Sequence, residues 1–175
     1  MITIGFIGTG LMGLPMAKNI LKSGFKLKAF NRSIEKAEPL KEFGAEISKT
    51  ISDVVKDSDF VITMLTDDSA VDAITSSSDF LDNLKSGSTV IDMSSVKPTT
   101  ATKHRTNLKS KNVNYLDAPV SGGTIGAEEA SLAIMVGGDQ SVFDNSEKIL
   151  KAMGNPTLVG PIGSGQVSKL ANQIV

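Results

Sequence analysis

Residues 2–22 read Ile-Thr-Ile-Gly-Phe-Ile, then Gly-Thr-Gly-Leu-Met-Gly, then Leu-Pro-Met-Ala-Lys-Asn-Ile-Leu-Lys. The first piece is an apolar run typical of a strand, and the third has the apolar spacing of an amphipathic helix. The middle piece carries glycines at positions 8, 10 and 13, which is the G-x-G-x-x-G spacing. Glycine-rich turns are common, so the strand before this turn and the helix after it are what make the pattern specific.

Each of these glycines has a separate physical role in a turn that binds a dinucleotide. Gly8 allows the tight turn out of the strand, Gly10 leaves room for a pyrophosphate, and Gly13 lets the helix pack closely on the strand. The pyrophosphate then lies at a helix N-terminus, where free N–H groups and the helix dipole favour an anion. We therefore expect the cofactor to be bound by the whole turn, Gly8, Thr9, Gly10, Leu11, Met12 and Gly13. The alternative is a structural turn without a ligand.

The length and composition are those of one ordinary globular domain. The chain has 175 residues, of which 40% are hydrophobic and 21% are charged, enough for an α/β domain with its own core. The net charge of −1 argues against a general electrostatic mode of nucleic-acid binding. The absence of cysteine excludes disulfides and thiolate chemistry. With no basic leader and no apolar run of about 18 residues, we expect a cytoplasmic protein that binds neither nucleic acid nor membrane.

Strand and helix patterns alternate along the rest of the chain, which predicts a doubly wound α/β fold of the Rossmann type, a mostly parallel sheet with helices on both faces. The expected strands cover residues 25–30, 45–47, 60–65, 89–93, 113–117, 132–136 and 157–159. The expected helices cover residues 34–43 with Ser33 as N-cap, a short turn beginning at Ser52 or Asp53, and residues 98–110, 141–153 and 166–175. Residues 126–131 are expected to form a connection of small residues.

The second expected strand ends in Asn31-Arg32-Ser33, about twenty residues past the glycines, where this fold selects its cofactor. An acidic residue here would bind the adenosine ribose hydroxyls and repel a 2′-phosphate, whereas this chain has an amide, a guanidinium and a hydroxyl. A guanidinium suits bidentate phosphate contact, so these residues favour NADP over NAD. The alternative is that Arg32 is a solvated loop residue. Because ligands lie beyond the carboxyl ends of parallel strands, Met64 and Leu65 should border the adenosine half of the cofactor.

Two features that suggest metal or proton chemistry have simpler explanations. The pair Asp67-Asp68 follows a strand, and carboxylates at the start of a helix cap it and offset its dipole, so we expect no metal site. His104 is the only histidine, and the polar side chains at positions 103, 105 and 107 indicate a solvated helix face. We therefore do not expect His104 to be catalytic, although imidazole suits proton transfer.

The loop Ala-Pro-Val-Ser-Gly-Gly at residues 118–123 follows another expected strand. Such a dense run of small residues at a strand end exposes backbone N–H groups and one hydroxyl, which suit a carboxylate without a formal positive charge. Ser121, Gly122 and Gly123 are therefore candidate substrate-binding residues, and the alternative is a structural turn.

Taken in order, these motifs resemble those of the β-hydroxyacid dehydrogenase family, which includes 3-hydroxyisobutyrate dehydrogenase, tartronate semialdehyde reductase and the glyoxylate/succinic semialdehyde reductases and is related to 6-phosphogluconate dehydrogenase. Residues 8–17 resemble its cofactor motif, residues 117–123 its substrate-carboxylate motif, and residues 163–173 its catalytic-lysine helix. Ser95 matches a serine or threonine that the family places near the nicotinamide, and residues 31–33 resemble the Asn-Arg-Ser/Thr of its NADP-using branch.

The resemblance implies an NADP-dependent oxidoreductase that transfers a hydride between NADP(H) and a small carboxylate-bearing aldehyde or alcohol, of the glyoxylate, succinic semialdehyde, tartronate semialdehyde or 3-hydroxyisobutyrate type. It implies that Lys169 is the general acid and that Asn172 and Gln173 orient the substrate oxygen. Gln173 departs from many members, which have a second asparagine there. Alternatives are a 6-phosphogluconate dehydrogenase-like enzyme, an imine reductase and a non-catalytic dinucleotide-binding module.

The end of the sequence adds an expectation about domains. The helix expected at residues 166–175 ends without a cap, and the resemblance implies a second, all-helical domain that completes the cleft and makes the protein a homo-oligomer. We therefore expect residues 1–162 to form the NADP-binding domain and residues 163–175 to begin the helix that leads to the missing domain. Such a piece should bind NADP(H) but turn over poorly.

Overall fold

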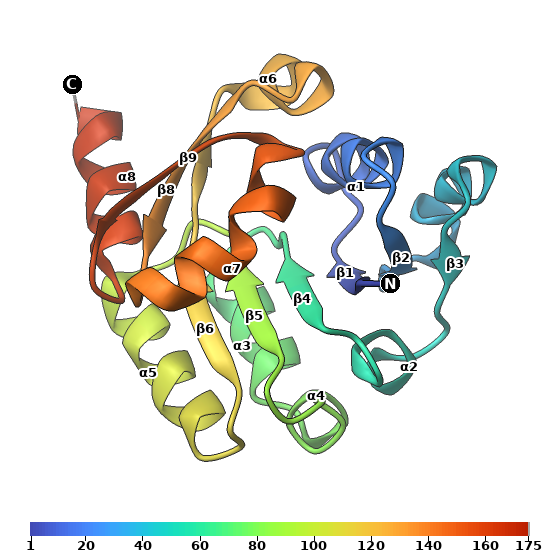
Figure 1. Cartoon of the computed structure of the whole chain (residues 1–175), viewed down its shortest axis with the longest axis horizontal. Helices are drawn as coiled ribbons and strands as arrows, with labels where there is room; N and C mark the ends of the chain where they lie inside the picture. Colours follow the sequence, from blue (N-terminus) through green and yellow to red (C-terminus); the bar gives the residue numbers. More distant parts are fainter. Residues whose placement is uncertain (175) are drawn as a thin grey trace.

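The computed structural model describes residues 1–174 and confirms the mostly parallel, doubly wound sheet (Figure 1). Over these residues the sheet has nine strands in the order β3-β2-β1-β4-β5-β6-β8-β7, and β9 pairs with β8. The strands are β1 (Thr3–Ile7), β2 (Lys26–Phe30), β3 (Glu46–Ile47), β4 (Phe60–Thr63), β5 (Thr89–Asp92), β6 (Asn114–Asp117), β7 (Val120–Ser121), β8 (Leu132–Gly137) and β9 (Gly154–Gly160). The pairs from β3 to β6 are parallel, whereas β8 runs antiparallel to β6 and β7. The strand order reverses between β1 and β4, where doubly wound sheets bind their ligands.

Helices cover both faces of this sheet. They are α1 (Gly13–Lys22), α2 (Ile51–Val55), α3 (Asp68–Thr75), α4 (Ser78–Leu81), α5 (Pro98–Lys109), α6 (Gly123–Glu129), α7 (Gln140–Lys151) and α8 (Ser164–Ile174). Because successive strand residues point to opposite faces, Phe6 packs in one core cluster with α1 and α7, and Ile7 packs in another with α2, α4 and α5. No helix within residues 1–174 combines the length and the apolar character needed to cross a bilayer.

The expected helix at residues 34–43 is wrong as an α-helix. The chain forms two 3₁₀ segments instead, η1 (Ile34–Lys36) and η2 (Glu38–Phe43), and the Ser33 side chain does not cap η1. Pro39 explains the break, because it has no N–H to donate to a carbonyl one α-turn earlier. Gly44 ends the segment in the left-handed conformation, with φ of 93°.

Residues 126–131 were expected to form a plain connection, but most of them belong to α6. A seven-residue helix that contains two glycines has little intrinsic stability, so tertiary contacts must hold it. The Asn19 side chain of α1 supplies one such contact, because its Nδ2 donates to the Ala127 carbonyl at 2.7 Å. This contact joins α1 to the segment that follows the small-residue loop.

Several element ends also differ from the expected ones. Thr50, not Ser52 or Asp53, is the N-cap of α2, and its Oγ1 accepts a hydrogen bond from the Asp53 N–H at 3.1 Å. Strand β9 is longer than expected because six of its residues pair with β8. Helix α8 begins two residues earlier than expected, at Ser164, and the last residue of the expected helix, Val175, lies outside the described residues.

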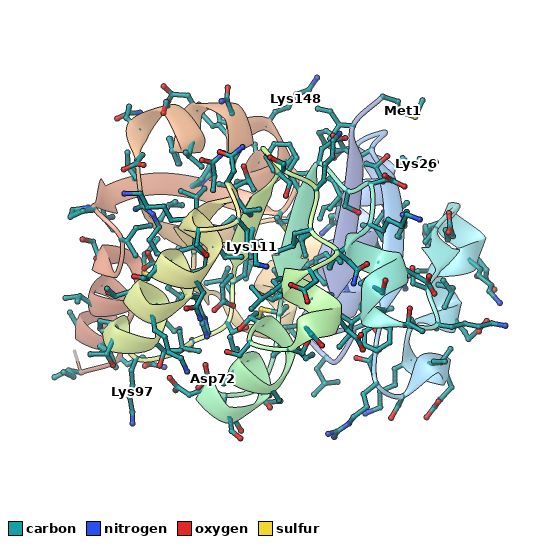
Figure 2. The ribbon with its side chains drawn as sticks, turned by 90° about the horizontal axis from the view of Figure 1, so that it is seen from below. Met1, Lys26, Asp72, Lys97, Lys111 and Lys148 are labelled. Atoms are coloured by element: carbon teal, nitrogen blue, oxygen red, sulfur yellow. The ribbon has the colours of Figure 1, made fainter. Side chains whose placement is uncertain are left out.

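The expected solvated position of His104 is wrong. Its side chain is only 1% exposed, and its Nε2 lies 2.7 Å from Asp72 Oδ1 and 3.1 Å from Thr75 Oγ1. Figure 2 shows Asp72 beside α5, the helix that carries the histidine. The polar neighbours misled the prediction because residues one position apart point about 100° apart around a helix. His104 therefore faces α3 and the core, while Lys103 and Arg105 flank it.

The interpretation of Asp67 and Asp68 as capping residues is confirmed. Asp67 is the N-cap of α3, and its Oδ1 accepts from the Ala70 N–H at 2.8 Å. Asp68 Oδ1 accepts from the Lys97 N–H at 3.0 Å and from Thr100 Oγ1, a bond that lowers the pKa of this carboxyl. Both carboxylates thus fix the starts of helices, α3 and α5.

Candidate cofactor and substrate site

The glycine turn leaves β1 and enters α1 with the geometry expected for a dinucleotide site. Gly8 has φ of 101°, and a Cβ there would collide with the Met64 carbonyl. A Cβ on Gly13 would collide with the Gly8 carbonyl, so α1 can approach β1 this closely only without a side chain. A Cβ on Gly10, by contrast, would meet no protein atom within 4 Å. The protein therefore needs the outer glycines for its own backbone, and it leaves space over Gly10 for a ligand.

Asn31 ties this turn to the end of β2. Its Oδ1 accepts from the Thr9 N–H at 2.9 Å, and its Nδ2 donates to the Ser33 carbonyl at 3.0 Å. The Gly8 N–H also donates to the Phe30 carbonyl at 3.0 Å. The Asn31 amide therefore sets the relative position of the glycine turn and the residues that follow β2, and both of its polar atoms are bonded to the backbone.

A groove of about 330 Å³ runs from the glycine turn past the ends of β2 and β4 to α3. We call it the adenosine groove; it is lined by Ile7, Gly8, Gly10, Phe30, Asn31, Arg32, Ser33, Lys36, Met64, Leu65, Thr66, Ala70, Ala73 and Ile74. The expected cofactor residues after β2 and β4 thus lie together. The described lining has two cations, exposed Arg32 and Lys36, and no carboxylate. Sequence analysis did not single out Lys36, which falls within the helix expected at residues 34–43.

Side-chain hydrogen bonds join the carboxyl ends of β4 and β5, next to the adenosine groove. The Leu65 N–H donates to Ser94 Oγ at 2.8 Å, and Asp92 Oδ1 accepts from Thr63 Oγ1 at 2.9 Å and the Ser94 N–H at 3.0 Å. Asp92 is fully buried, and this burial raises the pKa of its carboxyl. Ser94 thus points inward, and Ser95, the residue matched to the nicotinamide side, is exposed.

The small-residue loop and α8 meet although they lie far apart in the sequence. Ser121 ends β7, and Gly122 and Gly123 follow with φ of 138° and 63° at the start of α6. Asn172 Nδ2 lies 3.4 Å from Ser121 Oγ, across 51 residues of sequence. Lys169 lies one helical turn before Asn172 on α8 and is half-buried. The loop expected to form a carboxylate site and the helix expected to carry the proton donor are therefore neighbours; Gln173 beside them is exposed.

Asp117 fixes the start of α8 and was not singled out from the sequence. Its Oδ1 accepts from the Gly163 N–H at 2.8 Å and its Oδ2 from the Gln166 N–H at 3.0 Å. Burial raises the pKa of this carboxyl, and the hydrogen bonds from the two N–H groups oppose the rise. An acidic residue at the end of a buried strand, directly before the small-residue loop, was the available signal for this role.

An apolar stripe on α8 faces away from the sheet. Val167, Leu170 and Ile174 are 55%, 50% and 86% exposed, at spacings of three and four residues. Figure 1 shows α8 beside β8 and β9, with the C-terminus of the chain at its far end.

Comparison with known proteins identifies the family. Residues 3–163 match the model for the NAD binding domain of 6-phosphogluconate dehydrogenase. The chain is 44% identical over 174 residues to an uncharacterized oxidoreductase, YkwC, of Bacillus subtilis, and 38% identical over 174 residues to 2-hydroxy-3-oxopropionate reductase of Escherichia coli. In each case the match covers 98% of this chain, but only 60% and 59% of the relative.

A solved structure, 3-hydroxyisobutyrate dehydrogenase of Mycobacterium tuberculosis with L-serine, has a TM-score of 0.95 and 33% identity, covering 99% of this chain and 60% of that protein. The chain thus spans about three fifths of the length of these relatives. The match to the family model and the glycine turn, loop and lysine helix agree with one another. The chain therefore belongs to the family of NAD(P)-binding domains shared by 6-phosphogluconate dehydrogenase and the β-hydroxyacid dehydrogenases, and within it to the β-hydroxyacid dehydrogenases, which include 3-hydroxyisobutyrate dehydrogenase.

Proposed function

We propose that the protein is an NADP-dependent oxidoreductase that transfers a hydride between NADP(H) and a small aldehyde or alcohol bearing a carboxylate. The observation that carries this proposal is the contact between Asn172 on α8 and Ser121 on the small-residue loop. Lys169 lies one helical turn before Asn172 on α8, which supports a position for its amine near this loop, whose hydroxyl and backbone N–H groups suit a carboxylate. An amine and an anion site side by side fit the reduction of an oxo acid.

The choice of NADP rests on the charges of the adenosine groove. Arg32 and Lys36 line it without a competing carboxylate among the described lining residues. A 2′-phosphate carries charge that a guanidinium binds through paired hydrogen bonds and an ammonium binds as a point charge. NAD has a neutral hydroxyl where NADP has the 2′-phosphate, so it gains less from these cations and is the weaker candidate.

In this proposal each residue has a defined task, and the bound cofactor supplies the hydride. The open side of Gly10 and the N-terminus of α1 bind the pyrophosphate. Ser121, Gly122 and Gly123 hold the substrate carboxylate, while Asn172 and Gln173 orient the reacting oxygen. Lys169 Nζ donates a proton to that oxygen as the alcohol forms and takes it back in the reverse direction.

The substrate class follows from the same residues. Glyoxylate, succinic semialdehyde, tartronate semialdehyde and the oxidised partner of 3-hydroxyisobutyrate each combine a carboxylate with a reducible carbonyl. The reductase of Escherichia coli is named for an oxo acid of this kind, and the serine-bound dehydrogenase of Mycobacterium tuberculosis for the corresponding kind of hydroxy acid.

We also propose that α8 leads to a second, helical domain, because the relatives are longer than this chain. Such a domain would cover Val167, Leu170 and Ile174, complete the wall of the cleft and provide the contact for a homo-oligomer. Residues 1–162 would then form the cofactor-binding domain. The 175-residue chain alone should bind NADPH and turn over slowly.

The test is a comparison of binding with turnover. NADPH and NADH are titrated into the chain, and NADPH oxidation is followed in the full-length protein with glyoxylate, succinic semialdehyde and tartronate semialdehyde. Tighter binding of NADPH together with turnover of one of these aldehydes supports the proposal. NADPH binding without any turnover would instead identify a non-catalytic module. Reduction of NADP+ with 6-phosphogluconate, and no turnover of the aldehydes, would identify the related enzyme class.

A further inference from the structure

One buried side chain joins α8 to the loop that carries Ser95. Gln166 is 1% exposed; its Oε1 accepts from the Val96 N–H at 3.1 Å and its Nε2 donates to the Ser94 carbonyl at 2.8 Å. These bonds span 70 and 72 residues of sequence. An N–H needs an acceptor and a carbonyl needs a donor, so only one orientation of the amide forms both bonds.

The two hydrogen bonds of the Gln166 side chain take the place of strand pairing for the backbone that follows β5. Strand β5 ends at Asp92, so the backbone of residues 94–96 lies beyond the parallel ladder that holds β5. A carboxamide has N–H donors and a carbonyl acceptor in one plane, and Gln166 uses one of each to bond the residues on both sides of Ser95, as a neighbouring strand would. This arrangement holds the backbone of Ser95 while its side chain stays exposed. A buried N–H or carbonyl left without such a partner would be costly.

The other side of Gln166 is fixed as firmly. Its backbone N–H donates to buried Asp117, which also holds the Gly163 N–H. A Cβ on Gly165 would collide with the Met135 carbonyl, so the first turn of α8 lies directly on β8. Lys169 follows Gln166 by three residues, and side chains at this spacing lie on the same helix face. The hydrogen bonds of Gln166 therefore fix both the axial position and the rotation of α8, and with them the position of Lys169.

We propose that the Gln166 carboxamide is a positioning residue that keeps the Lys169 amine and the Ser95 hydroxyl in register on the nicotinamide side of the site. Gln166 acts through these two residues and does not itself touch the reactants. The inference rests on the proposed reductase function for the role of Lys169, and on the resemblance stated above for the position of Ser95 near the nicotinamide. It adds that the proton donor is aligned from the cofactor domain, by one buried amide, before any second domain closes over it.

The test uses two substitutions at this position and one matched control. Gln166→Met keeps the length of the side chain and removes both bonds. Gln166→Glu keeps a donor and an acceptor as the neutral acid and loses the donor when it ionises. Gln140→Met removes an exposed glutamine whose Nε2 bonds only Asp144 within α7. Thermal melts check that all three variants fold.

Nucleotide binding distinguishes a loss of positioning at the lysine from a general disturbance of the fold. Adenosine 2′,5′-bisphosphate occupies only the adenosine groove, so its Kd should change less than about twofold in every variant. In the full-length protein, kcat of Gln166→Met should fall about 10- to 100-fold, since a displacement near 1 Å in a site costs this much, while KM for the aldehyde changes less than about threefold. Gln140→Met should keep the wild-type kcat.

The dependence of kcat on pH provides a measurement that would not change if Gln166 only stabilised the fold. The kcat of Gln166→Glu should decrease as pH rises through the ionisation of the new carboxyl, a group that neither the wild type nor Gln166→Met contains. Asp92 and Asp117, the buried carboxyls at the ends of β5 and β6, are present in every variant, and Asp117 binds the backbone N–H of residue 166. Comparison with Gln166→Met, which adds no carboxyl, isolates the limb that the new carboxyl adds. Recovery of activity at low pH, when the acid mimics the amide, supports the proposal.

The outcomes distinguish the inference from the function on which it rests. If the wild type turns over an aldehyde and Gln166→Met has the same kcat as Gln140→Met, the positioning role is overturned. The role is also overturned if binding of adenosine 2′,5′-bisphosphate falls as much as kcat. If the wild type has no turnover, the proposed function has failed; amide hydrogen exchange at Val96 then decides the inference. Faster exchange of the Val96 amide in Gln166→Met, with exchange in Gln140→Met unchanged, supports the positioning role of Gln166. Unchanged exchange in Gln166→Met overturns that role.

Discussion

The adenosine groove and the lysine side of the site, which we define as Ser95, residues 121–123, Lys169 and Asn172, are assembled over different distances in the sequence. In the groove, the bond between Thr9 and Asn31 spans 22 residues and the one between Leu65 and Ser94 spans 29. On the lysine side, the bonds from Asn172 to Ser121 and from Gln166 to Val96 span 51 and 70 residues. The groove needs the parallel strands β1, β2 and β4 and the segments that directly follow them, whereas the lysine side needs α8 docked on β6 and β8. Binding and turnover should therefore respond to different substitutions.

The largest effect is expected on the lysine side. Lys169→Met should lower kcat of the full-length protein about 10²- to 10⁴-fold, because general acid catalysis contributes this much. NADPH affinity should change less than about threefold, because the adenosine groove does not include this residue. Steady-state kinetics with the best aldehyde, together with NADPH titration, measure both quantities. The control is Lys148→Met, which removes an exposed lysine of α7 labelled in Figure 2. A loss of kcat below tenfold would show that another group donates the proton.

The glycine turn offers a paired test of the groove. Gly13→Ala should lower the free energy of unfolding by about 1–3 kcal/mol, because its Cβ would collide with the Gly8 carbonyl. Gly10→Ala should change stability by less than about 0.5 kcal/mol, because its Cβ meets no protein atom within 4 Å. The same methyl should weaken NADPH binding about tenfold or more, since it enters the space left for the pyrophosphate. Urea unfolding and NADPH titration separate the two. Unimpaired NADPH binding by a folded Gly10→Ala variant would place the pyrophosphate elsewhere.

A smaller effect is expected for the cations after β2. Arg32→Ala should weaken NADPH binding about 10- to 100-fold and NADH binding less than about threefold, because only NADPH carries the 2′-phosphate. Lys36→Ala should act in the same direction but more weakly, about three- to tenfold. Lys26→Ala, at the opposite end of β2 and labelled in Figure 2, is the control. Equal losses for both nucleotides would mean that Arg32 and Lys36 do not select the phosphate.

The smallest effect concerns Asp92, whose Oδ2 has no hydrogen-bond partner among the described residues. Burial raises its pKa above the ordinary 3.8, so the folded chain binds this proton more tightly than the unfolded chain. The stability contribution of this carboxyl therefore decreases as pH rises from about that value through the folded-state pKa. Asp92→Asn keeps an oxygen for Thr63 and Ser94 and removes the ionisation, so its effect on the free energy of unfolding should be more favourable at pH 7 than at pH 3, by about 1 kcal/mol.

Urea unfolding of Asp92→Asn at pH 7 and at pH 3 tests the sign of this effect. The effect should be less favourable at pH 3, where the wild-type carboxyl is protonated in both states. Exposed Asp57→Asn is the control, since its left-handed backbone, with φ of 61°, also accepts asparagine. An effect of the same size at both pH values would exclude ionisation as the cause.

The accuracy of the sequence predictions follows the same division. The glycine turn, the order of the motifs and every strand except β7, which lies within the expected small-residue loop, were predicted because each depends on a local pattern. His104 was misread because its burial comes from α3, and α6 was missed because Asn19 of α1 and packing against β8 support a segment that is weak as an isolated helix. Asp117 and Gln166 were not singled out for a related reason. A carboxylate or an amide can be identified as a residue that joins two segments only when its hydrogen-bond partners, distant in sequence, are known.

The amino-acid sequence alone therefore determined the strand–turn–helix that opens the chain, the alternation that makes a doubly wound sheet, and the residue types offered to a phosphate and a carboxylate. Backbone conformation and hydrophobic periodicity depend on neighbours a few residues away, so they can be read along the chain. Only the tertiary structure decided that Asn172 meets Ser121, that Lys36 joins Arg32 in one groove, and that Gln166 bridges α8 to the Ser95 loop. Those contacts follow from how helices dock on the sheet, and docking depends on the shape and burial of whole surfaces rather than on any single stretch.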